Sequence, residues 1–297
     1  RKVFLRHMKL GVLYQKVTGK ELEGAHDALN DSRGCGRVYP YLRDKNPVLK
    51  EIGVPKIVLK ASDVAGIIGR SQYRPPLEVA DELWSKYMPS TFTGKTKEQI
   101  AMKAISTCNV AQDLLKDVEQ FKSTNSSSVE QKFRAVSNQL EKNSGLQKDE
   151  LDATRDHIRK TLYTNHGMRH EKTTADNYEN MREDSTFYKY DVCTIKGTLY
   201  QVVGRIDRVR DNEDGTKTLV EIKNRARGLF RAVRDYEEIQ CQTYMEMLGM
   251  DECALIEQHN DKRLTHNIKR DRHMWNEQIL PALRNFCERF HDMLSTH

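Results

Sequence analysis

Two short motifs bring carboxylates and a lysine onto segments that we expect to form neighbouring strands. The first, Gly204–Asp207, ends in an aspartate, and the second, Val220–Lys223, has the sequence Val-Glu-Ile-Lys. Because side chains alternate on a β-strand, Glu221 and Lys223 share one face, and the two apolar residues point toward a core. Carboxylate oxygens suit Mg²⁺, and a nearby lysine can position or deprotonate an attacking water. The pattern predicts metal-assisted hydrolysis.

The register of the hairpin between the two motifs decides whether their carboxylates meet. Residues 211–216, Asp-Asn-Glu-Asp-Gly-Thr, are a turn signal. A loop centred near Asp214 places Asp207 directly across from Glu221, whereas a tight two-residue turn shifts the pairing by one residue. A solvated cross-strand ion pair is the competing interpretation, because Glu-x-Lys also occurs at Glu130–Lys132 without an acidic partner strand.

Two further polar side chains have apolar neighbours on the same helix face. Glu171 shares a face with Ala175, and Gln240 lies four residues from both Tyr236 and Tyr244. Alone, either could be a hydrogen-bonded polar group in a core. Together with the two motifs, they define a candidate pocket.

Hydrophobic periodicity predicts a mixed α/β domain around these residues. Segments rich in Val, Ile, Tyr and Thr predict strands at Phe187–Val192, Leu199–Val209, Thr218–Lys223 and Cys253–Ile256. Helical spacing predicts helices at Leu77–Tyr87, at about Ala232–Leu248 with Gly249 as its end, and at the C-terminus. In that last helix Pro281 predicts a kink, and the apolar face consists of Ile279, Leu283, Phe286, Phe290 and Met293.

The segments that precede the strands are expected to be mainly helical. Residues 46–185 have this character, and the highly charged residues 95–160 predict a helical insertion. Within the insertion, Lys122–Ser128 has the composition of a flexible linker. Residues 1–45 predict one or two short helices.

The composition excludes several classes of protein. The chain has 297 residues, of which 31% are charged and 37% hydrophobic, as in a globular domain. It has no apolar run of about 18 residues, so we expect no membrane span. Its net charge of +6 only weakly favours an anionic partner. The 6 cysteines form no CxxC pair, which argues against metal fingers and iron–sulfur sites and favours a reducing, intracellular compartment.

The order of the motifs resembles that of the PD-(D/E)xK nucleases. It runs from Gly-x-x-x-Glu ending at Glu171, through Asp207 and Glu221-x-Lys223, to Gln-x-Gln-x-Tyr beginning at Gln240. The most similar branch is the YqaJ/lambda-exonuclease type, whose upstream serine motif resembles residues 59–69 and 73–78. The resemblance covers roughly residues 56–258. It implies a restriction-endonuclease-like core with a mixed β-sheet flanked by helices, in a nuclease domain of residues 46–297.

The resemblance also implies a metal site. Asp207 and Glu221, with the Ile222 carbonyl, would hold a catalytic Mg²⁺, for which Mn²⁺ could substitute. Glu171 would support a second metal or its water. Lys223 would activate or orient the nucleophilic water.

Further residues would contact the substrate. Gln240 would fix Lys223 or the scissile phosphate, and Ser62 would contact the DNA backbone or its 5′ end. Many members have Cys-Pro after the lysine, whereas this chain has the basic run Asn224–Arg227. The expected DNA-binding residues are Ser62, Arg70, Arg225, Arg227 and Tyr244.

A second resemblance lies near the start of the chain. Residues 24–31, Gly-Ala-His-Asp-Ala-Leu-Asn-Asp, resemble the last motif of DEDDh (DnaQ-like) 3′–5′ exonucleases. There His26 and Asp31 would be general base and metal ligand. The Asp-x-Glu motif of those enzymes is missing from the sequence, so we expect residues 1–45 to be a remnant of an upstream domain. An ordinary helix with a surface histidine is the alternative.

These observations predict a Mg²⁺-dependent deoxyribonuclease. The resemblance favours an exonuclease on linear double-stranded DNA ends, in recombination, repair or viral or phage DNA processing. It also implies a single-strand annealing protein as a partner and a homo-oligomer, in a bacterial, phage-host or viral-host cytoplasm or nucleus. A structure-specific or single-strand RecB-like endonuclease is one alternative, and a non-catalytic nucleic-acid-binding protein is another.

Overall fold

The computed structural model describes residues 56–176, 178 and 180–295. The expected remnant domain, with His26 and Asp31, lies outside these residues. The larger of the two compact units comprises Val58–Cys193 and Tyr200–His297, and the described residues of the smaller unit are Lys56, Ile57 and Thr194–Leu199. The described part of the smaller unit includes a tight turn at Lys196 and Gly197, whose φ angles are 46° and 85°. Two successive left-handed residues are typical of a type I′ hairpin turn.

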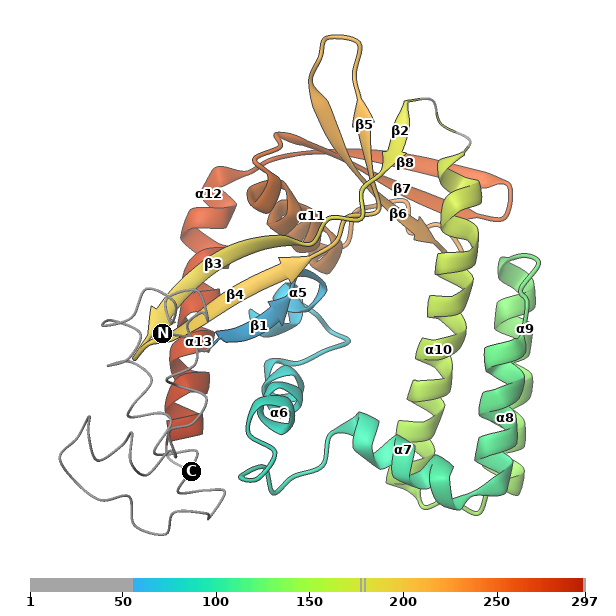
Figure 1. Ribbon diagram of the computed structural model, residues 1–297. Coiled ribbons are helices and arrows are strands. Elements are labelled where there is room, and N and C mark those ends of the chain that lie inside the picture. Colours follow the sequence, from blue (N-terminus) through green and yellow to red (C-terminus); the bar gives the residue numbers. More distant parts are fainter. Residues whose placement is uncertain (1–55, 177, 179, 296–297) are drawn as a thin grey trace, which may run out of the picture. The chain divides into compact units, whose positions relative to one another are not determined.

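The described chain is a mixed α/β protein in which a run of helices, α5 to α10, precedes a run of strands, β2 to β6 (Figure 1). The strands are β1 (Lys56–Lys60), β2 (Met181–Glu183), β3 (Tyr188–Ile195), β4 (Thr198–Gly204), β5 (Arg208–Asp211), β6 (Lys217–Asn224), β7 (Glu252–His259) and β8 (Lys262–Lys269). The helices are η1 (Ala61–Asp63), α5 (Val64–Ile67), α6 (Pro76–Tyr87), α7 (Lys97–Thr107), α8 (Asn109–Gln120), α9 (Ser126–Asn143), α10 (Lys148–Ala175), α11 (Asp235–Leu248), α12 (Arg272–Met274), the π-helical η2 (Trp275–Ile279) and α13 (Leu280–Ser295).

The larger sheet carries the second motif on β6, and the first motif, Gly204–Asp207, leads into its strand β5. Its strand order is β2-β5-β6-β7-β8, and only the β6–β7 pair is parallel within it. The α11 helix connects these two parallel strands and ends at Gly249, whose φ of 69° is the left-handed cap that the sequence predicts. Strand β8 was not predicted. Only Ile268 in it is buried, so this strand lacks the apolar alternation that would reveal it.

The smaller sheet has the order β1-β4-β3 and corrects two expectations. Lys56–Lys60 is a strand rather than part of a helical region, because Ile57 and Leu59 are buried whereas Val58 is only partly buried and both lysines are exposed. The predicted single strand Leu199–Val209 is interrupted at residues 205–207, where the chain passes from β4 to β5. The motif carboxylate, Asp207, is the last residue of this break.

Two helices cover strand β6 from opposite faces. Val220 and Ile222 pack with Ala175 of α10 in one apolar cluster, as the strand alternation predicts. The α11 helix lies on the other face, which carries Glu221 and Lys223 (Figure 1). Both faces are therefore covered, as is usual for strands in a parallel pair.

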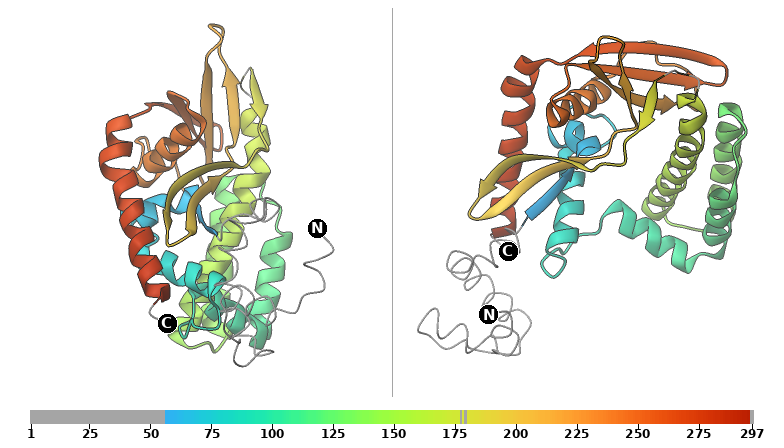
Figure 2. Two further views of the ribbon diagram at one scale, coloured as in Figure 1. Left: turned by 60° about the vertical axis from the view of Figure 1, so that its left-hand side comes forward. Right: turned by 45° about the horizontal axis from the view of Figure 1, so that its top comes forward.

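The predicted helical insertion has its own core. Helices α8, α9 and α10 lie side by side, and buried residues from α7 to α10 form a separate apolar cluster (Figure 2). The 28 residues of α10 run from this cluster to the sheet, which makes one continuous rod of about 42 Å. Helix α10 therefore belongs to the core of the insertion and also packs against strand β6.

The serine-rich segment is not a flexible linker. Ser126–Ser128 form the first turn of α9, and Asn125 caps this helix, because its Oδ1 accepts the Ser128 N–H at 2.9 Å. Asn and Ser favour helix caps for the same reason that they favour loops, namely local hydrogen bonds to the backbone. Composition alone does not separate the two cases.

The C-terminal helix contains a π-helical segment in place of a simple kink. The η2 segment directly precedes α13, and Pro281 is the second residue of α13. Proline has no N–H to give to the preceding turn, and a π-turn is one way to accommodate that loss. No helix of the described chain has both the length and the apolar character needed to span a membrane.

Acid should weaken the helical insertion through His166. This side chain is 4% exposed, and its Nδ1 lies 3.0 Å from Ser123 Oγ. Burial lowers the pKa of His166 from 6.5 to about 4, and the positive charges of His170 and Arg169 add to the effect. The stability that the neutral His166 side chain contributes is therefore fully present above pH 6.5 and is lost as the pH falls toward 4. The loss in the free energy of unfolding is at most about 3 kcal/mol. Urea unfolding at pH 7 and 4.5 should show a smaller acid loss in His166→Gln than in the wild type. Equal losses would contradict the assignment.

Candidate active site

Asp207 lies at the point where β5 begins to pair with β6. The last pair of the ladder is Arg208 with Val220, so the next position joins Asp207 and Glu221. The connecting loop, residues 212–216, is centred on Asp214, and the first of the two predicted registers is therefore the one observed. Asp207 Oδ2 accepts the Ile222 N–H at 2.8 Å. Burial raises the pKa of Asp207 although Lys223 and this hydrogen bond oppose the shift.

Gly204 allows the helix α11 to approach the end of β4. A Cβ at this position would lie 2.5 Å from a ring carbon of Tyr244 and 2.8 Å from Ala61 Cβ. Both distances are shorter than any real carbon–carbon contact. A glycine is required here, and it lets the Tyr244 ring fill the space beside the strand end.

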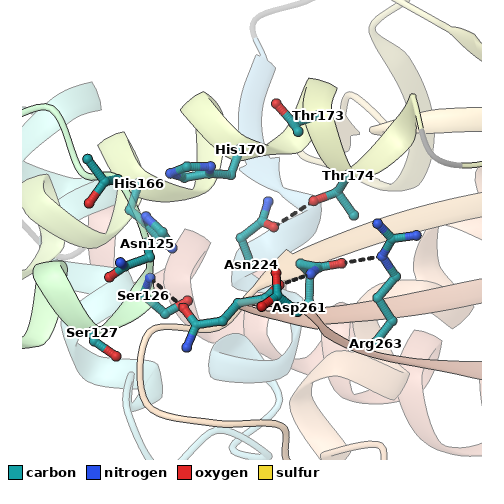
Figure 3. A pocket seen from close by; sticks show the side chains of 13 residues that line it. Asn125, Ser126, Ser127, His166, His170, Thr173, Thr174, Asn224, Asp261 and Arg263 are labelled. Atoms are coloured by element: carbon teal, nitrogen blue, oxygen red, sulfur yellow. Dashed lines mark hydrogen bonds between the residues drawn. The ribbon is translucent and has the colours of Figure 1, made fainter.

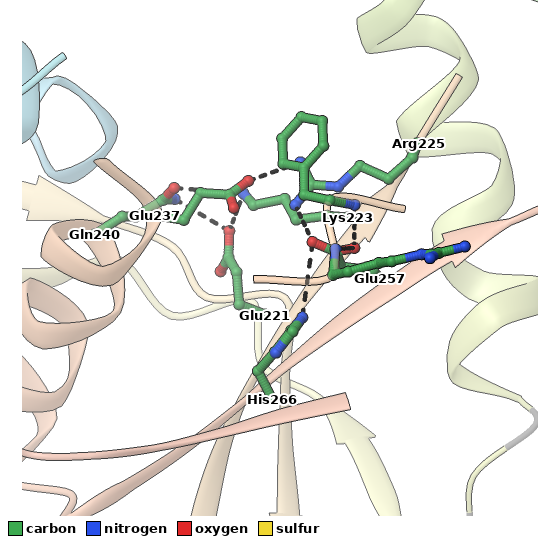
Figure 4. Close-up of polar contacts among 9 residues, drawn as sticks. Glu221, Lys223, Arg225, Glu237, Gln240, Glu257 and His266 are labelled. Atoms are coloured by element: carbon green, nitrogen blue, oxygen red, sulfur yellow. Dashed lines mark hydrogen bonds and ion pairs between the residues drawn. The ribbon is translucent and has the colours of Figure 1, made fainter. Parts of the chain in front are cut away.

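Glu221, Lys223 and Gln240 form a closed triangle of polar contacts (Figure 4). Glu221 Oε1 accepts from Lys223 Nζ at 2.6 Å and from Gln240 Nε2 at 3.0 Å, and Gln240 Oε1 accepts from Lys223 Nζ at 3.3 Å. Because Glu221 is only 4% exposed, burial raises its pKa to about 7, and the charge of Asp207 adds to this. Burial opposes the charge of Lys223, but the two carboxylates outweigh it and raise the pKa of the ammonium group.

One carboxylate oxygen at the centre of the site has no partner. Glu221 Oε2 is buried and finds no hydrogen-bond donor among the described residues. Leaving a buried acceptor unpaired costs free energy, so a cation bound to this oxygen would stabilise the site. The N–H and C=O of one residue point to the same side of a strand, so the Ile222 carbonyl faces the side of Asp207. Two carboxylates and a carbonyl are a hard oxygen set that fits Mg²⁺ or Mn²⁺.

Glu171 lies near this set but is bound elsewhere. Its Oε1 accepts from Arg208 Nη1 at 2.7 Å, and the same Nη1 donates to the Asp207 carbonyl at 2.6 Å. Burial raises the pKa of Glu171, and the charge of Asp207 raises it further. The described residues contain no group of three His, Cys, Asp or Glu side chains placed to hold one ion. The candidate donor set is therefore Asp207, Glu221 and the Ile222 carbonyl, with Glu171 at its margin.

The expected DNA-binding residues do not form one cluster in the structure. Ser62 is exposed and lines a cavity of about 490 Å³ together with Gly204, Arg205 and Tyr244. Other cations of this cavity are Lys60, Arg74 and Lys86. Tyr244 itself is only 5% exposed, which leaves its ring little surface for a base.

The three expected arginines are all engaged within the chain. Both Nε and Nη2 of Arg70 lie 2.6 Å from Asp235. Arg227 Nε donates to Glu130 Oε2 at 3.1 Å, which ties the chain after β6 to α9. Arg225 is buried between two carboxylates, so its charge is already compensated and its guanidinium is not presented to a phosphate.

The sequence analysis did not predict this buried cluster, which consists of Arg225, Glu237 and Glu257. Arg225 Nη1 lies 2.7 Å from Glu237 Oε1, and Nη2 lies 2.9 Å from Glu257 Oε1 (Figure 4). Glu237 is one helical turn before Gln240, and Glu257 pairs in register with Lys223. The only sequence signal was a carboxylate directly after the apolar run Cys253–Ile256.

A second cavity lies on the opposite face of β6. It has a volume of about 520 Å³ and a polar lining that includes Asn125, His170, Asn224 and Arg263 (Figure 3). Asn224 and Lys223 are adjacent on the strand and therefore point to opposite faces. None of the sequence-predicted site residues lines this second cavity.

Comparisons with known proteins agree with the motif order. A family model described as the PD-(D/E)XK nuclease superfamily matches residues 100–292, so helices α8 to α10 lie within the matched region and Ser62 lies outside it. No curated protein matches the sequence.

Solved structures with low sequence identity are also similar. One is a protein named SSO0001 (15% identity, 61% of this chain and 84% of that chain covered, TM-score 0.36). Another is the alkaline exonuclease LHK-Exo from Laribacter hongkongensis (14% identity, 66% and 95% covered, TM-score 0.36). The same exonuclease in complex with dAMP gives 14% identity, 63% and 89% covered and a TM-score of 0.34.

A divalent cation should stabilise the folded chain through Glu221. Binding to the native state alone adds about 2.7 kcal/mol when the ion is at 100 times its Kd, which corresponds to a rise of several degrees in Tm. We expect Mg²⁺ to raise the Tm of the wild type and of Glu252→Gln, an exposed control, but not of Glu221→Gln. EDTA should reverse the rise. An equal rise in all three proteins would place the ion elsewhere.

Proposed function

The chain belongs to the PD-(D/E)XK nuclease superfamily, and from this we propose that it is a Mg²⁺-dependent deoxyribonuclease that hydrolyses DNA phosphodiester bonds. The observation that carries the metal-dependent part is Glu221, which holds Lys223 with one buried oxygen and leaves the other without a donor among the described residues. A vestigial pocket would have no reason to keep this costly arrangement. A non-catalytic binding protein is therefore the weaker alternative.

The metal ion and the chain have separate tasks in this proposal. Held by Asp207, Glu221 and the Ile222 carbonyl, Mg²⁺ would supply the positive charge that lowers the pKa of a water and neutralises the phosphate. The residues of the chain supply orientation. Gln240 and Glu221 together hold the Lys223 ammonium group in one place.

The raised pKa of Lys223 favours one of its two expected roles. An ammonium group that keeps its proton is a hydrogen-bond donor and a positive charge, not a base. We therefore propose that Lys223 orients the attacking water or a phosphate oxygen. Arg208 would set the position of Asp207 and Glu171, because its Nη1 contacts both residues.

The exonuclease mode follows from the resemblance of the ordered motifs to the lambda-exonuclease branch. Ser62 supports it, because this residue lines the same cavity as Gly204 and Arg205, beside the candidate metal ligands. The annealing-protein partner, the homo-oligomer and the intracellular compartment follow from sequence arguments alone and stay predictions. The described cysteines, all but Cys35, are free thiols.

Replacing the lysine should abolish cleavage without unfolding the protein. We expect Lys223→Ala to lose at least about 100-fold in rate on linear duplex DNA with Mg²⁺, because a positioned donor at the reacting group is removed. Lys217→Ala is the matched control, since it lies on the same strand but is exposed. Release of end label from 5′- and 3′-labelled duplexes measures the rate.

The same assay separates the candidate functions. Loss of the 5′ label as a mononucleotide would support the lambda-type exonuclease. Cuts in circular or branched DNA would favour the RecB-like endonuclease instead. No cleavage of duplex, single-stranded or branched DNA by the folded wild type would overturn the nuclease proposal.

A further inference from the structure

The segment that follows the catalytic strand is unusually basic. Residues 225–234, here called the arginine loop, have the sequence Arg-Ala-Arg-Gly-Leu-Phe-Arg-Ala-Val-Arg and contain no carboxylate. The loop starts two residues after Lys223 and ends at Arg234, the residue that caps α11. Gln240 lies on the second turn of that helix. The loop therefore joins the two elements that carry the lysine and its amide partner.

The four arginines divide into two pairs. Arg225 and Arg227 are neutralised by carboxylates, the first by Glu237 and Glu257 and the second by Glu130. Arg231 and Arg234 are exposed, and no carboxylate in the described part of the chain forms an ion pair with either. The second pair thus presents two uncompensated charges to solvent.

The backbone at Arg231 is held in a conformation that arginine rarely adopts. Its φ is 62°, in the left-handed region that costs a residue with a Cβ about 1–2 kcal/mol. Glu257 imposes this turn. The Glu257 side chain is fully buried, and its Oε2 accepts the Phe230 N–H at 2.7 Å and the Arg231 N–H at 3.4 Å.

Arg234 is ordered by an aromatic ring rather than by a carboxylate. The Phe230 ring centroid lies 4.0 Å from the Arg225 guanidinium carbon and 4.9 Å from that of Arg234. A cation over a ring face is attracted without being neutralised. The chain therefore holds the backbone of Arg231 and the guanidinium of Arg234, and both side chains keep their full charge.

We propose that Arg231 and Arg234 bind backbone phosphates of the DNA substrate. Guanidinium groups suit phosphate because their planar donors match two of its oxygens. The inference rests on the proposed function and adds to it the residues that hold the substrate strand. Glu257 is the positioning residue that sets the shape of the arginine loop.

Salt dependence of DNA binding tests the number of phosphate contacts. We would measure fluorescence anisotropy of a labelled 20-base-pair duplex in EDTA, where no cleavage occurs, over a range of KCl concentrations. Each lost contact lowers the slope of log K against log salt by about 0.9, so the variant Arg231→Ala/Arg234→Ala should lose about 1.8. The control Lys217→Ala/Arg272→Ala removes the same charge from two exposed positions outside the loop and should keep the wild-type slope. An unchanged slope in the loop variant, or an equal change in the control, would overturn the proposal.

The left-handed backbone at Arg231 provides a second test, in which the Tm and the DNA affinity should respond differently to one substitution. Glycine adopts a φ of 62° without cost, so Arg231→Gly should keep or raise the Tm while it weakens DNA binding as alanine does. A lower Tm with unchanged DNA affinity would mean that Arg231 serves the fold, and would overturn the proposal. The slope is measured in EDTA, where no cleavage occurs, so it tests the loop proposal even if the folded wild type cleaves no DNA, and a failure of the nuclease proposal and a failure of the loop proposal are distinguishable.

Discussion

The burial of two neighbouring carboxylates is the constraint on which this structure depends. Asp207 and Glu221 occupy adjacent positions at the end of one ladder, and desolvation raises the pKa of both. Two like charges at this separation repel each other, and burial removes the water that would screen them. Lys223 compensates only part of the negative charge. The remaining negative charge is available to bind a cation.

The elements around the site hold that charge in place from two faces. The α11 helix supplies Gln240 and approaches closely because Gly204 has no side chain. On the other face α10 supplies Glu171, and Arg208 connects this residue to the Asp207 backbone. Helix α10 continues into the core of the helical insertion, so a displacement of the insertion would also displace Glu171. The insertion is thus structurally coupled to the candidate active site.

Local patterns in the sequence were sufficient for the centre of the site but not for its surroundings. Strand alternation and a loop centred on Asp214 gave the correct facing of Asp207 and Glu221. The basic run after Lys223 suggested phosphate contacts at Arg225, which the structure buries instead. Its partners lie 12 and 32 residues further along the chain, and no local rule predicts such an ion pair. Serine-rich segments fail for a related reason, because caps and linkers use the same residues.

The distribution of arginines follows from the negative charge of the site. Three carboxylates at or near the metal-binding set would repel a polyanion, so a phosphate chain can approach only where positive charge offsets them. Arg208 and Arg225 cannot do this, because each is already paired within the fold. Arg231 and Arg234 retain their charge, with a buried carboxylate holding the backbone of the first and an aromatic ring contacting the guanidinium of the second. In the proposed function the chain therefore uses some of its arginines to build the site and others to bind the substrate.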